Sequence, residues 1–274
     1  MIPFTKAHGA RNDFLLTWAH EAPAESVWPR AAIALCDRHA GVGADGWLLV
    51  KPASQGAPAS IRLFNPDGSE AEISGNGTRC AAAFLCDAGL AGPEIEILTG
   101  AGRKRLRLLD RRGLHFEFEM DMGEARILPE DLRVTLEVQG RALDCTLVWP
   151  GNPQCAVFAG EIPEDWIALG ASLERHPRFP NRTNVSFVQV RDEANLEVRF
   201  YERGAGVTMS SGTGSTGAFA AARARGLIGP RATVHTPAGP LALREEGGVI
   251  LLAGPAEIVA GGEFYFSGIS ANQR

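Results

Sequence analysis

The chain carries one short passage twice, and this internal repeat constrains its fold more than any other feature. Ser74-Gly75-Asn76-Gly77 and Ser211-Gly212-Thr213-Gly214 lie 137 positions apart (211 − 74), half the length of the 274-residue chain. The same register continues without a gap on both sides, through Ile61/Val198, Arg62/Arg199, Ala81/Ala218, Gly89/Gly226 and Leu90/Leu227. Solenoid units are shorter than this period. The repeat therefore predicts one lobe used twice, with a site built between two related halves.

Each copy predicts the same local structure. An apolar run with β-branched or aromatic residues, 61–64 or 198–201, is typical of a strand. Beyond a glycine-containing loop, the serine precedes an alanine-rich stretch that favours a helix, 80–88 or 218–225. Each serine thus stands at an N-cap, beside free backbone N–H groups and the positive end of the helix dipole. Two such termini would bind an anion such as a substrate carboxylate; the simpler interpretation is that both serines are only caps.

Composition places the chain among globular proteins with a large core. It is 45% hydrophobic with a net charge of −5, which fits one large domain or two lobes and argues against nucleic acid as a partner. No apolar stretch reaches membrane-spanning length, and the first residues lack a signal-peptide pattern. Five cysteines, an odd number without a CxxC pair, favour a reducing cytoplasm. Exposed edge strands would be compatible with a homodimer.

Strand-like runs outnumber helical ones, and the regular β-α-β alternation of a doubly wound sheet is absent, so the pattern predicts an α+β fold. Besides the two alanine-rich stretches, helices are expected near 28–38 and 166–173. Gly212-x-Gly214-x-x-Gly217 formally matches a dinucleotide fingerprint, but no acidic residue follows about 20 positions on. The chain also lacks GK[ST] and HExxH, and its histidines are scattered without ligand spacing. Neither a nucleotide cofactor nor a metal is expected.

Short polar segments interrupt the apolar sequence: HGARNDF (8–14), RHAGVGADG (38–46), FNPDGSE (64–70), GNP (151–153), TNV (183–185) and YERG (201–204). Taken singly, each is typical of a turn. Together they place four asparagines and Arg203 on loops near the two predicted helix starts. Carboxamides and a guanidinium suit a small zwitterion, because they donate to carboxylate and the carboxamides also accept from ammonium.

In order and spacing, these segments resemble the diaminopimelate epimerase family, cofactor-independent enzymes of lysine and cell-wall precursor synthesis. The motifs HGxxNDF, RHxGVGxD, FNxDGSE, GNGxRC, GNP, YERGxG and GTG match from Phe4 through roughly Pro255. The resemblance implies two pseudo-symmetric lobes, each a strongly curved, barrel-like mixed sheet around a central helix. The N-terminal lobe would span 1–114 and the C-terminal lobe 115–263, with a last strand near 264–274 returning to the first lobe. The substrate would lie in the cleft between the lobes.

The resemblance also implies a reaction and a set of residue roles. The enzyme would be an isomerase that interconverts LL- and meso-diaminopimelate by proton transfer on both faces of Cα. The side chains implied to hold the distal amino-acid end are Asn12, Asn65, Asn152, Asn184 and Arg203. Backbone N–H groups of Gly75-Asn76 and Gly212-Thr213 would hold the carboxylate at the reacting carbon. The carbonyl of Glu202 would add an acceptor for ammonium.

The chain departs from the family pattern at the reacting positions. The family has a cysteine pair acting as base and acid where this chain has Ser74 and Ser211, which would be the catalytic residues here. The residues expected as histidine after GNP and as glutamate after RGxG are Gln154 and Val207. A serine hydroxyl is far less acidic than a thiol, whose pKa starts near about 8.5 and falls at a helix N-terminus.

Three functions stay open on this sequence. The first is a slow serine-based epimerase acting on diaminopimelate or a similar diacid. The second is a divergent isomerase or lyase on a related amino acid, which needs proton transfer on one face only or a substrate with a more acidic C–H. The third is a catalytically inactive amino-acid-binding homologue that keeps the pocket.

Overall fold

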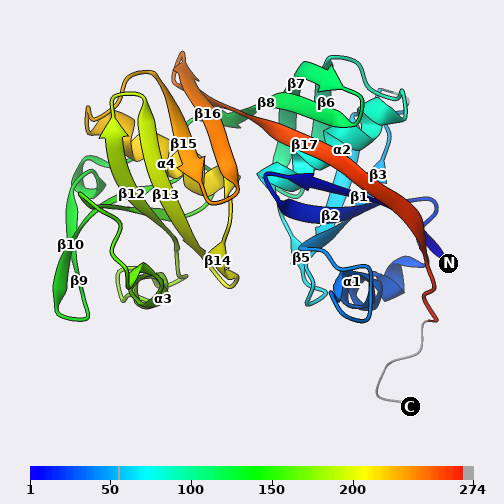
Figure 1. The fold of residues 1–274 in the computed structure, drawn as a ribbon, viewed down its shortest axis with the longest axis horizontal. Helices are drawn as coiled ribbons and strands as arrows, with labels where there is room; N and C mark the ends of the chain where they lie inside the picture. Colours follow the sequence, from blue (N-terminus) through cyan, green and yellow to red (C-terminus); the bar gives the residue numbers. More distant parts are fainter. Residues whose placement is uncertain (55, 268–274) are drawn as a thin grey trace. The chain divides into compact units, whose positions relative to one another are not determined.

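The computed structural model describes residues 1–54 and 56–267, which form two compact units. Unit 1 contains Met1–Glu119 and the residues from Pro255 on, and unit 2 is Met120–Gly254. Figure 1 shows the course of the chain through each unit. The strand expected near 264–274 falls partly on 268–274, which lie outside the described residues, and the last observed strand ends at Phe264.

Unit 1 is a mixed sheet with one buried helix and one outer helix. Its elements in chain order are β1 (Ile2–Gly9), β2 (Asn12–Trp18), the short 3-10 helix Glu25–Val27, α1 (Trp28–Cys36), β3 (Gly46–Lys51), β4 (Ala59–Phe64), β5 (Glu70–Ala71), α2 (Gly75–Asp87), β6 (Glu94–Thr99), β7 (Gly102–Arg112) and β8 (His115–Gly123), whose residues from Met120 on belong to unit 2. Every residue of α2 from Gly75 to Cys86 is buried, so this helix is the centre of the unit.

Unit 2 repeats that plan. Its elements are the 3-10 helix Pro129–Asp131, β9 (Val134–Val138), β10 (Arg141–Val148), β11 (Gln154–Phe158), α3 (Trp166–Glu174), β12 (Asn184–Asp192), β13 (Asn195–Glu202), β14 (Gly206–Thr208), α4 (Gly212–Ala224), β15 (Arg231–Thr236), β16 (Gly239–Glu246) and β17 (Val249–Phe264). The last of these strands, β17, pairs with β16 in unit 2 and, further along, with β1 in unit 1.

Strand pairing shows that the two units share one topology. In unit 1, β2 and β3 are parallel, β4 is antiparallel to β3 and β5 but parallel to β6, and β6 is antiparallel to β7. In unit 2, β11, β12, β13, β14, β15 and β16 follow the same sequence of pairings. The predicted α+β class with mixed sheets is confirmed, and the central helices α2 and α4 occupy matching places between β5 and β6 and between β14 and β15.

The four predicted helices are all present, and local hydrogen bonds set their ends. The helix expected to end near residue 38 stops at Cys36, because the carboxylate of Asp37 accepts the N–H groups of His39 and Ala40, at 2.7 Å each. The N–H of Val42 then returns to the carbonyl of Leu35. These bonds replace the next helical turn with a compact loop that leads into β3.

Candidate active site

Ser74 and Ser211 cap the two central helices, as predicted. The hydroxyl of each accepts the N–H three residues on, from Gly77 or Gly214, at 3.1 Å. Both serines have extended backbone angles, as N-caps do. The first N–H groups of a helix have no partner within it. In both units, therefore, a serine hydroxyl lies beside helix N–H groups suited to an anion, whereas proton transfer by the serines stays a prediction.

Ser211 also has an acidic neighbour. The Glu202 carboxylate, at the end of β13, accepts a hydrogen bond from the Thr208 hydroxyl at 2.5 Å, and the Ser211 side chain lies close enough to lower its pKa. Burial raises the pKa of Glu202 above its ordinary value, although the two hydroxyls act in the opposite direction. Such a carboxyl is a better proton acceptor than an ordinary surface glutamate.

The matching position in unit 1 carries no acid. The 137-residue register aligns Asn65 with Glu202, and the Asn65 amide donates to the Ser69 hydroxyl at 3.0 Å. Among the described residues of unit 1, the hydrogen bond to the Ser74 hydroxyl comes from the backbone of Gly77 alone. The two serines are therefore equivalent as caps but differ in their chemical surroundings.

The structure assigns different positions to the two residues that depart from the family pattern. Gln154 is buried, and its amide donates to Asn152 at 2.8 Å and to the Thr213 hydroxyl at 3.2 Å. Val207 is 47% exposed on β14. The carboxylate that reaches Ser211 belongs to Glu202, for which the sequence predicted only a backbone role. That expectation missed the side chain because the tight pairing of β13 with β14 is not visible in the motif.

The remaining predicted ligands form small groups within each unit. In unit 2, the Asn184 amide donates to the carbonyl of Pro153 at 3.0 Å and accepts the backbone N–H of Arg203 at 2.9 Å. The Arg203 side chain is exposed. In unit 1, Asn12 accepts a hydrogen bond from the Asn76 amide at 3.1 Å, whereas Asn65 bonds within its own loop.

A family model described as diaminopimelate epimerase matches residues 4–128 and 146–259. The chain belongs to the diaminopimelate epimerase family. A relative named diaminopimelate epimerase, from Pelotomaculum thermopropionicum, is 40% identical over 275 residues, covering 95% of this chain and 98% of the relative. Another of that name, from Synechococcus sp. (strain JA-3-3Ab), is 42% identical over 261 residues, covering 89% and 90%.

Solved structures of low sequence identity share the fold of this family member. A Bacillus anthracis phenazine biosynthesis protein of the PhzF family superposes with a TM-score of 0.71 at 16% identity, covering 97% of this chain and 99% of that one.

Within the described residues, no group of three or more acidic, histidine or cysteine side chains has the geometry to hold a metal. Over the same residues, no helix has both the length and the apolar character needed to cross a membrane.

The five cysteines of this epimerase-family chain are free and buried. Two of them, Cys80 and Cys155, lie inside α2 and on β11. Burial raises the pKa of the Cys80 thiol to about 12. Since the thiolate is the reactive form of cysteine, these residues offer no substitute for a thiol at position 74 or 211.

Proposed function

We propose that this chain is a cofactor-independent epimerase that interconverts LL- and meso-diaminopimelate, or acts on a similar diacid, by proton transfer at Cα. Family membership over nearly the whole chain supports the reaction class. The observation that carries the proposal is the matched pair of helix N-termini, each capped by a serine and each accompanied by asparagine side chains.

The proposed roles follow the chemistry of each group. The backbone N–H groups at the helix starts hold the carboxylate of the reacting carbon, because they are unpaired donors at the positive end of a dipole. Asparagine and arginine side chains hold the remaining polar groups, since they donate to carboxylate and the asparagines also accept from ammonium. The residues proposed to bind substrate are Asn12, Asn65, Gly75, Asn76, Asn152, Asn184, Glu202, Arg203, Gly212 and Thr213; those proposed to move the proton are Ser74 and Ser211.

A serine hydroxyl needs a base beside it to accept a Cα proton. A helix dipole contributes about 0.3–2 kcal/mol, and a pKa unit corresponds to about 1.36 kcal/mol. The dipole therefore lowers a hydroxyl pKa by one or two units at most, which leaves it far above neutrality. We propose that Glu202 supplies the missing basicity on the unit 2 side, taking the proton through the Ser211 hydroxyl that it contacts.

A second function is favoured by the difference between the units. Ser211 has a carboxylate partner, whereas Ser74 has none among the described residues of its own unit. A strong base on one side alone suits an isomerase or lyase that removes a proton from a single face of a related amino acid. A binding protein without activity is the third outcome that the experiment below distinguishes.

We further propose that the protein works in the cytoplasm, because its buried free thiols suit a reducing compartment. A homodimer stays a prediction, which sedimentation velocity on the purified chain would test.

The test is proton NMR of the protein with LL-diaminopimelate in D₂O, following loss of the α-proton signal. A Ser74→Cys/Ser211→Cys double variant serves as the comparison. Exchange by the wild type supports the serine-based enzyme, and appearance of meso-diaminopimelate identifies it as an epimerase. Exchange by the double variant alone would show that the pocket binds this substrate but the serines do not act on it. Exchange by neither would remove diaminopimelate as the ligand.

A further inference from the structure

The side-chain amides of two asparagines in unit 1 form a chain of hydrogen bonds that runs in one direction. The chain begins at a guanidinium, which donates, and ends at a carboxylate, which accepts. The Asn12 amide nitrogen donates to Asp45 at 2.7 Å. The Asn12 oxygen accepts from the Asn76 amide nitrogen at 3.1 Å, and the Asn76 oxygen accepts from the Arg79 guanidinium at 2.5 Å. A carboxylate only accepts and a guanidinium only donates. The two amides between them can therefore adopt one orientation only.

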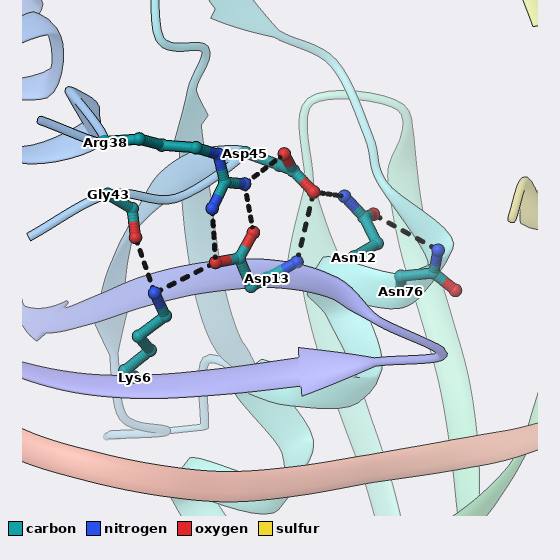
Figure 2. Close-up of polar contacts among 7 residues, drawn as sticks. All are labelled: Lys6, Asn12, Asp13, Arg38, Gly43, Asp45 and Asn76. Carbon is teal, nitrogen blue, oxygen red and sulfur yellow. Dashed lines mark hydrogen bonds and ion pairs between the residues drawn. The ribbon is translucent and has the colours of Figure 1, made fainter. Parts of the chain in front are cut away.

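The acceptor end is held in place by a cluster of charges (Figure 2). One nitrogen of Arg38 donates to Asp45 at 2.7 Å and to Asp13 at 2.6 Å. Lys6 donates to the carbonyl of Gly43 at 2.7 Å and forms an ion pair with Asp13 at 3.0 Å. The backbone N–H of Asp13 also donates to Asp45, at 3.2 Å. Asp45 is thus fixed from both sides, with one carboxylate oxygen directed to Asn12.

The donor end is a buried cation that has no anionic partner among the described residues. Arg79 is fully buried in α2, and its acceptors are the neutral oxygens of Asn76 and Pro255. One of its terminal nitrogens has no hydrogen-bond partner among the described residues. Burial lowers the pKa of Arg79 to about 10, so it stays charged at neutral pH. This uncompensated charge, at the start of the helix that Ser74 caps, favours an anion beside the amide chain.

We propose that Asp45 is a positioning residue: through Asn12 it fixes the orientation of both amides, so that the half-buried Asn12 offers an N–H donor to a substrate carboxylate. In the flipped orientation, the Asn12 oxygen would face the Asp45 carboxylate, and two acceptors would oppose each other. The part of this inference that concerns substrate rests on the proposed function. The orientation of the amides does not, and it is measurable without ligand.

The first experiment is ¹⁵N NMR of the side-chain amides in the ligand-free protein, comparing Asp45→Asn with wild type. An asparagine at 45 can both donate and accept, so the direction of the chain is then imposed from the Arg79 end alone. We expect the Asn12 signals and also the Asn76 signals, two links away, to shift or double. Asp37→Asn is the matched control: it makes the same change in the same loop, but among the described residues Asp37 bonds only to N–H groups of that loop. Unmoved Asn76 signals, or equal shifts in the control, would overturn the proposal.

The second experiment measures diaminopimelate affinity by calorimetry. A hydrogen bond to a charged group corresponds to about tenfold or more in affinity. We expect about that loss in Asp45→Asn and less than about twofold in Asp37→Asn, with similar melting temperatures. Wild-type binding with no loss in Asp45→Asn would refute the positioning role. If wild type does not bind and the NMR shifts occur as expected, the proposed substrate is wrong and the amide orientation stands.

Discussion

At the scale of single residues, Glu202 makes stability depend on pH in a direction that can be worked out. Its pKa is raised above the ordinary 4.5, mainly by burial, so the folded chain binds its proton more tightly than the unfolded chain. Stability therefore falls as pH rises from about 4.5 through the raised pKa. Glu202→Gln cannot ionise, so we expect its stability relative to wild type to increase over that range and then level off. Urea unfolding from pH 4 to 8 measures this difference.

Asp192 serves as a control, because its pKa is shifted in the opposite direction to that of Glu202. Its pKa lies below the ordinary 3.8, chiefly because the backbone N–H of Ala194 and the side chain of Asn195 donate to the carboxylate. That contribution is present above pH 3.8 and is lost as pH falls. Asp192→Asn should therefore lose stability relative to wild type as pH rises towards about 4, whereas Glu202→Gln gains stability above about 4.5. Parallel pH profiles in the two variants would show that the pKa of Glu202 is not raised in the folded chain.

At the scale of elements, the contribution of an N-cap serine to stability can be measured independently of its proposed role in proton transfer. Replacing an N-cap serine with alanine costs about 1 kcal/mol, because the N–H that it accepted loses its partner. We expect Ser74→Ala to lower the free energy of unfolding by about that amount and Ser74→Thr, which keeps a hydroxyl, to cost much less. Urea unfolding at pH 7 checks both. An unchanged stability in Ser74→Ala would mean that the Gly77 N–H bond contributes nothing.

The packing of α3 on β13 depends on one glycine. A Cβ built on Gly170 would lie 2.8 Å from the Cβ of Tyr201 and 2.9 Å from its ring, closer than real contacts allow. We expect Gly170→Ala to destabilise by about 1–3 kcal/mol, the usual cost of overpacking. Gly160→Ala is the control, because nothing lies within 4 Å of its Cβ position and its φ is not positive. Thermal unfolding of both variants measures the difference, and equal melting temperatures would contradict the packing argument.

The elements themselves were largely predictable, and the site less so. The serine caps and the alanine-rich helices are local signals, since a cap bonds three residues ahead. The contact of Glu202 with Ser211 requires the hairpin of β13 and β14, and the chain from Arg79 to Asp45 joins residues from α2, β2 and the loop before β3. Such long-range contacts depend on strand register, which a motif does not encode.

At the scale of the whole molecule, the repeat in the sequence covers less than the repeat in the structure. In the 137-residue register, identical residues are most frequent around and after the two central helices, from Arg62/Arg199 to Arg107/Arg244. The shared strand pairing begins earlier, at β2/β3 and β11/β12, where the residues have diverged. Buried strands accept many apolar residues of suitable volume. Two strands can therefore keep the same pairing after their sequences have diverged. The serine and the glycines at the two helix starts are the same in both units because they meet specific backbone requirements there.

Divergence between the repeats leads to a prediction about the reaction. Unit 2 keeps an acid beside its serine, and unit 1 has Asn65 at the matching position, whose amide does not accept a proton. Under the proposed function, a proton removed from Cα by the Glu202–Ser211 pair is returned by the same pair more readily than by Ser74. We therefore expect deuterium to enter one epimer with retained configuration, faster than that epimer converts to the other.

Proton NMR in D₂O gives the exchange rate, and chromatography of the separated stereoisomers gives the rate of epimerisation. Glu202→Gln should abolish exchange, because its amide cannot hold the proton, while Asp192→Asn, on a distant turn of the same unit, should leave it intact. Equal rates of exchange and epimerisation would mean that Ser74 delivers protons as readily as Ser211. In that case, the base that serves unit 1 must be a group other than the described neighbours of Ser74 in that unit.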